Sequence, residues 1–142
     1  MKLMADKKKV LIVDDDPDLR GGLVILLGQN YEILEAPDGD SGMKILSSAK
    51  VNLVLLDVAM PGMSGLEMLK NVREKWPALR VLMLTAQTDL KLAMQALDLG
   101  ATAYITKPFD FGGLRAEVKR LLDEPSHSKE EQNSEYRPWR VS

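Results

Sequence analysis

The chain has 142 residues, of which 45% are hydrophobic and 28% are charged, and its formal net charge at pH 7 is −2. This balance is typical of one soluble globular domain with a short appendage, and it does not favour nucleic acid as a partner. The sequence holds no cysteine, and its one histidine is His127. Thiolate chemistry, a catalytic triad and a multi-histidine metal site are therefore excluded.

The apolar runs of the chain are short. None approaches the roughly 18 residues that a membrane-spanning helix needs. Near the N-terminus, the lysines at 7–9 precede only four apolar residues before three aspartates, which is too short for the core of a signal peptide. We therefore expect a cytoplasmic protein without membrane insertion.

Five of these apolar runs are typical of buried strands, and they occur at residues 10–13, 31–34, 51–56, 81–84 and 103–105. They show little alternation with polar residues, as expected for strands that are covered on both faces. Between them, apolar residues follow the 3.6-residue period of one-faced helices, most clearly at 19–27, 90–97 and 114–122. The segment 38–49 follows this period less well.

Local signals mark where several helices begin and end. Asp16 followed by Pro17 indicates an N-cap with proline at the first helical position, rather than a metal ligand. Ser64 and Glu67 have the spacing of a capping box. Gly100 stands where a left-handed residue would close the fourth helix.

Five strands that alternate with five helices predict an α/β fold, in which a doubly wound parallel sheet lies between two helical layers. We expect a lead-in at residues 1–7, one domain at 8–123 and a C-terminal tail at 124–142. The tail is rich in charged residues and serine, which indicates disorder or a short docking segment. It is too short for a DNA-binding domain, so this chain is not expected to bind nucleic acid directly.

The polar residues that follow the strands point to chemistry. Asp14 and Asp15 follow the first strand, Asp57 the third, Thr85 the fourth and Lys107 the fifth. In an open parallel sheet, ligands bind beyond the carboxyl ends of the strands. With the strand order 2-1-3-4-5, these four strands are neighbours, and we expect their polar residues to meet in one pocket.

Three carboxylates in one small site need a counter-charge that a single lysine does not supply. Mg²⁺ suits this inventory, because it binds through one or two carboxylates, waters and a phosphoryl oxygen. Asp57 is then the candidate nucleophile toward a phosphoryl group. Thr85 offers a hydroxyl donor and Lys107 an ammonium group to the transferred oxygens.

Four motifs at these strand ends resemble the receiver domain of response regulators, the CheY-like family of bacterial two-component signalling, over about residues 8–123. They are VLIVDDD at 10–16, LLDVAMPG at 55–62 with SGLE at 64–67, LTA at 84–86, and GATAYITKPF at 100–109. The resemblance implies a flavodoxin-like three-layer sandwich.

The resemblance also assigns roles at the site. It implies that Asp57 takes a phosphoryl group from a phosphohistidine of a sensor histidine kinase or a histidine phosphotransfer protein. It further implies that Asp15 and Asp57 bind Mg²⁺ directly, Asp14 through water, and Ala59 through its backbone carbonyl. Lys107 would contact the phosphoryl oxygens from a cis bond to Pro108.

The same resemblance implies a switch. Thr85 would move toward the phosphoryl group and Tyr104 would turn inward, which would alter the surface formed by the helix at 90–97, the strand at 103–105 and the helix at 114–122. That surface is expected to bind a downstream protein or to form a phosphorylation-dependent homodimer. By the same resemblance, Ala59 and Gln87 occupy positions that in this family tune how water reaches the aspartyl phosphate. Their small or neutral side chains leave the lifetime of the phosphate open.

Two other functions remain as alternatives. A magnesium-dependent phosphatase with an aspartate nucleophile needs a second aspartate two residues later, and Ala59 stands at that position here. The other alternative is a pseudo-receiver, an interaction module that works without phosphorylation. We expect a switch that phosphorylates and dephosphorylates itself, not a turnover enzyme.

Overall fold

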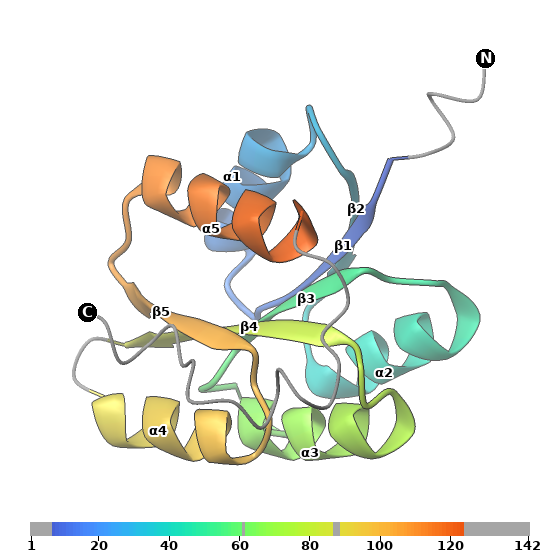
Figure 1. Ribbon diagram of the computed structural model, residues 1–142, viewed down its shortest axis with the longest axis vertical. Coiled ribbons are helices and arrows are strands. Elements are labelled where there is room, and N and C mark those ends of the chain that lie inside the picture. Colours follow the sequence, from blue (N-terminus) through green and yellow to red (C-terminus); the bar gives the residue numbers. More distant parts are fainter. Residues whose placement is uncertain (1–6, 61, 87–88, 124–142) are drawn as a thin grey trace.

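Five strands alternate with five helices in the computed structural model, which describes residues 7–60, 62–86 and 89–123 (Figure 1). The strands are β1 (Lys9–Val13), β2 (Glu32–Ala36), β3 (Leu53–Asp57), β4 (Arg80–Ala86) and β5 (Ala103–Lys107). The helices are α1 (Pro17–Leu27), α2 (Gly39–Ser48), α3 (Gly65–Lys75), α4 (Leu90–Asp98) and α5 (Phe111–Asp123). The predicted tail at 124–142 lies outside the described residues, as do residues 1–6 of the lead-in.

All neighbouring strands pair in parallel, in the order β2-β1-β3-β4-β5. This order confirms the prediction. Along the register, Leu11 pairs with Leu34 on one side and Val54 on the other, and Leu56 pairs with Met83. Because every strand runs the same way, their carboxyl ends meet at one edge of the sheet.

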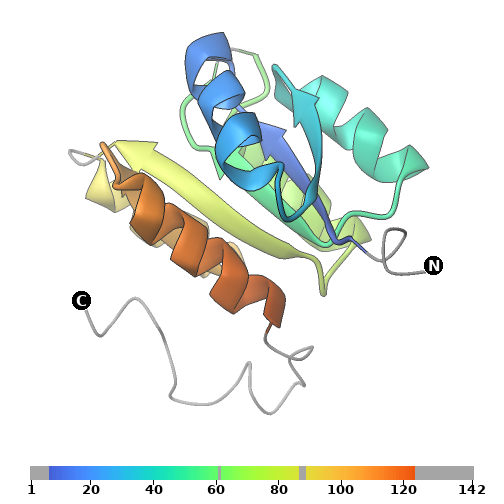
Figure 2. The ribbon, with the colours of Figure 1, turned by 90° about the horizontal axis from the view of Figure 1, so that it is seen from above.

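The sheet lies between two helical layers, with α1 and α5 on one face and α2, α3 and α4 on the other (Figures 1 and 2). Successive strand residues point to opposite faces. In β1, Val10 and Ile12 pack in the core on the α1 and α5 side, whereas Leu11 and Val13 pack in the core on the other side. This double burial explains why the strands read as continuous apolar runs.

Strand β2 is an exception to the expectation that every strand is covered on both faces. It lies at the edge of the sheet, and its residues Glu32 and Glu35 are exposed. The strand also begins and ends later than predicted, and so does β3, which reaches Asp57. Apolar runs show where strands are buried, but the backbone pairing that bounds a strand extends into polar residues.

The predicted helix signals are confirmed. The Asp16 side chain accepts hydrogen bonds from the backbone N–H groups of Asp18 and Leu19, which begins α1. Ser64 and Glu67 form a reciprocal capping box at α3. Segment 38–49 forms α2, and the carboxylate of Asp38 caps this helix by accepting from Ser41 N at 2.8 Å.

The start of α3 lies directly against the end of β3, because Gly65 has no side chain. A Cβ atom at Gly65 would collide with the carbonyl oxygen of Asp57 and lie 2.7 Å from Val58 Cα. Both obstacles are backbone atoms, so neither can turn aside. The backbone that carries Asp57 is thus held by a close contact that only glycine permits.

We expect Gly65→Ala to lower the free energy of unfolding by about 1–3 kcal/mol, because the added methyl group overpacks this contact. Urea denaturation would measure the change. Gly21→Ala is the matched control: a Cβ at Gly21 meets nothing within 4 Å, and the residue lies inside α1. Alanine there should stabilise the protein by about 0.5–1 kcal/mol. Equal effects of both substitutions would contradict the close-contact explanation.

Candidate functional site

The carboxyl edge of the sheet brings together polar residues from several strands. Asp14 directly follows β1, Asp57 ends β3 and Lys107 ends β5. Asp14 N donates to Ala36 O at 3.1 Å, and Val58 N donates to Leu84 O at 2.9 Å, so strand pairing extends to the site. These side chains are therefore positioned by the sheet itself.

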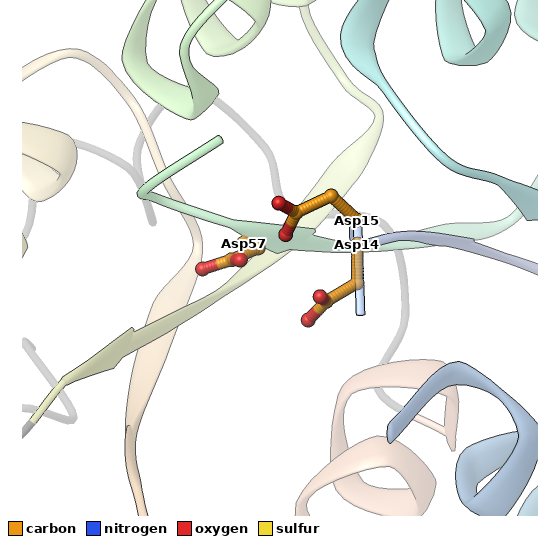
Figure 3. A group of neighbouring side chains, drawn as sticks. All are labelled: Asp14, Asp15 and Asp57. Atoms are coloured by element: carbon orange, nitrogen blue, oxygen red, sulfur yellow. The ribbon is translucent and has the colours of Figure 1, made fainter. Parts of the chain in front are cut away.

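Three carboxylates form a cluster at this edge (Figure 3). One oxygen from each of Asp14, Asp15 and Asp57 lies within 4.8 Å of the others. Asp14 is fully buried and Asp57 is 6% exposed, whereas Asp15 is exposed. Asp16 is not among them, in keeping with its role as a helix cap. The predicted convergence of the three carboxylates is confirmed.

Lys107 joins the two buried carboxylates. Its Nζ atom lies 3.3 Å from Asp14 Oδ2 and 3.4 Å from Asp57 Oδ1. The peptide bond between Lys107 and Pro108 is cis, as the resemblance implied. One ammonium group thus faces two buried carboxylates, with the exposed carboxylate of Asp15 nearby, so the acidic charge exceeds the basic charge among these four side chains.

The two buried carboxylates also accept hydrogen bonds from backbone N–H groups. Asp14 Oδ1 accepts from Asp16 N at 2.9 Å, and Asp57 Oδ1 accepts from Ala59 N at 3.2 Å. The backbone N–H of Ala59 thus donates a hydrogen bond to the carboxylate of Asp57. The backbone carbonyl of Ala59 as a metal ligand stays a prediction.

Burial raises the pKa of Asp57 from its ordinary value of 3.8 to about 6. The main cause is desolvation of the carboxylate, and repulsion by Asp14 adds to it. Attraction to Lys107 and the hydrogen bond from Ala59 N oppose the shift without cancelling it. An ionised Asp57 therefore carries an energetic cost that a further positive charge would relieve.

The donor set fits a hard divalent cation. Carboxylate oxygens are the ligands that Mg²⁺ and Ca²⁺ prefer, and the described part of the site offers neither imidazole nor thiolate. The net negative charge of the three carboxylates and Lys107 is complementary to the positive charge of such a cation. Asp14, Asp15 and Asp57 are the side chains that would hold such an ion.

Thr85 lies on β4 and Tyr104 on β5, and the contacts of both residues are with other parts of the fold than the carboxylate cluster. The Thr85 side chain is buried, and its hydroxyl donates to the carbonyls of Ala86 and Asp89, both at 3.4 Å. It thus faces the start of α4. Tyr104 pairs with Met83 in the sheet and packs, half-buried, against the core on the α2, α3 and α4 side. Gln87 lies outside the described residues.

Sequence reasoning missed Arg20. Its guanidinium, on α1, donates through Nη1 to the backbone carbonyl of Asp14 at 2.6 Å. The sequence shows only a basic residue six positions after Asp14, and the period of α1 identifies its apolar face alone. The contact depends on how α1 crosses the edge of the sheet, which no local pattern reveals.

Comparison with known proteins identifies the family. The response regulator receiver domain matches residues 10–119. The chain belongs to this family. Among curated relatives of the receiver domain, sporulation initiation phosphotransferase F of Bacillus subtilis (strain 168) is 35% identical over 120 residues, which are 81% of this chain and 94% of that protein. The sensor histidine kinase TmoS of Ectopseudomonas mendocina is 35% identical over 123 residues, 85% of this chain.

Solved structures agree with this assignment. Chemotaxis protein CheY4 of Vibrio cholerae has a TM-score of 0.77 and 32% identity, and the match covers 82% of this chain and 99% of that one. A CheY-like receiver domain protein from Methanospirillum hungatei JF-1 has a TM-score of 0.79 and 31% identity, with 83% and 95% covered. The predicted fold is therefore confirmed.

The receiver domain has the phosphoacceptor role in two-component signalling. The match with this chain covers very different shares of its relatives' lengths. It covers 13% of TmoS, 48% of the transcriptional regulatory protein PhoP of B. subtilis and 94% of phosphotransferase F. Within the described residues, no helix has the length and apolar character needed to cross a membrane.

The raised pKa of Asp57 predicts a pH dependence of stability in metal-free protein. The folded-state pKa lies above the unfolded-state value, so ionised Asp57 destabilises the fold above pH 6, and protonation relieves this cost as the pH falls from 6 toward 4. We expect Asp57→Asn to stabilise the protein at pH 8 by about 1–3 kcal/mol, with the advantage shrinking through that window.

Urea denaturation at several pH values would measure this difference, and carboxyl ¹³C NMR would measure the pKa directly. Asp98→Asn, at an exposed position on α4, is the control and should change little. If Asn at position 57 gives the same stability change at pH 4 and pH 8, the stated cause is wrong.

Proposed function

We propose that Asp57 is the phosphoacceptor of this receiver domain and that Mg²⁺ is its cofactor. The observation that carries the proposal is the position of Asp57, whose carboxylate lies beside Lys107 and within a cluster of two further carboxylates. The donor is a phosphohistidine of a sensor histidine kinase or a histidine phosphotransfer protein. TmoS, a sensor histidine kinase by name, and phosphotransferase F support this class of partner.

In the transfer, a carboxylate oxygen of Asp57 forms a bond to phosphorus while the nitrogen–phosphorus bond of the phosphohistidine breaks. The electron pair of that bond stays on the departing imidazole. Lys107 lies close enough to Asp57 to bind an oxygen of the transferred group and offset its charge. When bound, Mg²⁺ supplies positive charge to the same oxygens. With a pKa of about 6, Asp57 is largely ionised at neutral pH and thus ready to attack.

We further propose that Thr85 and Tyr104 carry the signal to the surface formed by α4, β5 and α5. The hydrogen bonds of the Thr85 hydroxyl to described residues are long, at 3.4 Å, so little is lost at these contacts when the hydroxyl turns toward a phosphoryl oxygen. One of these bonds holds the carbonyl of Asp89, which directly precedes α4. If the phosphoryl group binds Thr85 better in one conformation of Thr85 and its loop than in the other, phosphorylation shifts the population of molecules toward that conformation.

We propose that the protein is a cytoplasmic switch rather than a turnover enzyme. We also propose that it does not itself bind nucleic acid. Asp57 has no second aspartate two residues later to act as general acid and base, because that residue is Ala59. A downstream protein, or a second phosphorylated copy of the chain, would read the altered surface. Exposed Leu90 and Met94 on α4 support such a contact.

We expect incubation with Mg²⁺ and acetyl phosphate to add one phosphoryl group per chain, and Asp57→Asn to abolish the adduct. Intact-mass spectrometry measures the adduct, and phosphate release measures turnover. Absence of an adduct in the wild-type chain would favour the pseudo-receiver. Steady phosphate release over many turnovers would favour the phosphatase.

A matched pair of variants separates the metal site from the helix cap. Asp15→Asn removes a carboxylate from the cluster, so phosphorylation should need a higher Mg²⁺ concentration. Asp16→Asn changes the neighbouring residue, where asparagine caps a helix about as well as aspartate. It should leave the Mg²⁺ requirement unchanged, and equal effects of both would count against the assigned cluster.

If Thr85 couples the site to α4, the Thr85→Ala variant should still be phosphorylated. Its phosphorylation should no longer change the conformation of α4 and Tyr104. We expect most of the phosphorylation-dependent shifts in the amide NMR signals of Tyr104 and α4 to be lost. Thr85→Ser, which keeps the hydroxyl, should retain them. Full signal changes in the alanine variant would show that Thr85 does not couple the site to α4.

A further inference from the structure

Arg20 links α1 to the acidic edge of the sheet. Its Nη1 atom donates to Asp14 O at 2.6 Å, and its Nε atom lies 3.3 Å from Glu35 Oε1 in β2. The Arg20 side chain is 18% exposed, so most of it is covered, while Glu35 is more open. The guanidinium therefore bridges β2 and the residue that follows β1. Its bond to Asp14 is with the backbone carbonyl, not with the carboxylate.

Hydrogen bonds restrain both backbone groups of Asp14, its N–H and its C=O, and Arg20 makes one of them. The N–H of Asp14 donates to Ala36 O at 3.1 Å, and its C=O accepts from Arg20. Glu35, which holds the guanidinium, is the residue before Ala36. The end of β2 thus restrains both peptide groups of Asp14, one directly and one through Arg20.

The second of these peptide groups joins Asp14 to Asp15. Because a peptide unit is planar, the hydrogen bond to Asp14 O also sets the plane from which the Asp15 backbone continues. Asp14 and Asp15 together supply two of the three clustered carboxylates. Their relative placement therefore depends on the orientation of one peptide group, and Arg20 holds that group.

We infer that Arg20 is a positioning residue for Mg²⁺: it orients the Asp14–Asp15 peptide so that both carboxylates face the cation together with Asp57. The inference rests on the proposed function, since it assumes that the cluster binds Mg²⁺. Groups that orient metal ligands from outside the coordination sphere typically change metal affinity by about 10- to 100-fold when they are removed.

The charge of Arg20 and its geometry act in opposite directions, which makes the inference testable. A positive charge near the cluster repels a cation, so the loss of that charge alone would tighten Mg²⁺ binding. Loss of the positioning contact would weaken binding. Lysine keeps the charge but lacks the planar fork that reaches Asp14 O and Glu35 at once.

The test is a titration of the unphosphorylated full chain with MgCl₂, followed through the amide NMR signals of Asp15 and Ala59. We expect Arg20→Lys to raise the dissociation constant for Mg²⁺ by about 10-fold, near the lower end for such residues. Arg20→Gln should also weaken binding, although it removes a positive charge. The thermal unfolding midpoint, measured on the same samples, separates lost positioning from lost stability.

Arg115→Lys is the matched control, because Arg115 also makes a side-chain hydrogen bond, to Asn30 at 3.2 Å, at a distance from the cluster. It should leave the Mg²⁺ affinity unchanged. Unchanged affinity in Arg20→Lys, or tighter binding in Arg20→Gln, would overturn the inference while the wild-type site stands. Absence of Mg²⁺ binding in the wild-type chain would overturn the proposed cofactor and this inference together.

Discussion

An excess of negative charge at the carboxyl edge of the sheet is the constraint on which the site depends. Asp14 and Asp57 are buried there, the ammonium group of Lys107 contacts both, and the exposed carboxylate of Asp15 is close by. Desolvation and mutual repulsion make this arrangement costly, as the raised pKa of Asp57 shows. A cation bound among these carboxylates would relieve the same cost.

The rest of the fold keeps this costly arrangement in place. The strands that carry Asp14, Asp57 and Lys107 are neighbours in the sheet, with apolar cores on both faces. The close contact at Gly65 prevents the backbone of Asp57 from moving toward α3. Arg20 restrains the turn after β1 from the other side. The site is therefore rigid where the carboxylates need to stay together.

The two ends of α4 differ in the hydrogen bonds that hold them. At its C-terminal end, the guanidinium of Arg73 on α3 donates to Gly100 O at 3.1 and 2.7 Å, and to the carbonyls of Trp76, Pro77 and Leu79. Burial lowers the pKa of Arg73. At its N-terminal end, Asp89 makes no side-chain cap bond. Helix α4 is thus anchored at its C-terminal end, whereas at its N-terminal end Thr85 contacts the carbonyl of Asp89 through a hydrogen bond of 3.4 Å.

The sequence by itself determined the alternation of strands and helices, the caps at Asp16 and Ser64 and the gathering of Asp14, Asp57 and Lys107. Each follows from short-range patterns, or from the rule that parallel strands end at one edge. Only the tertiary structure decided which contacts each residue makes. The exposure of β2, the bond from Arg20 to Asp14 O and the burial that raises the pKa of Asp57 arise where elements distant in sequence meet. Local patterns do not encode the packing that creates them.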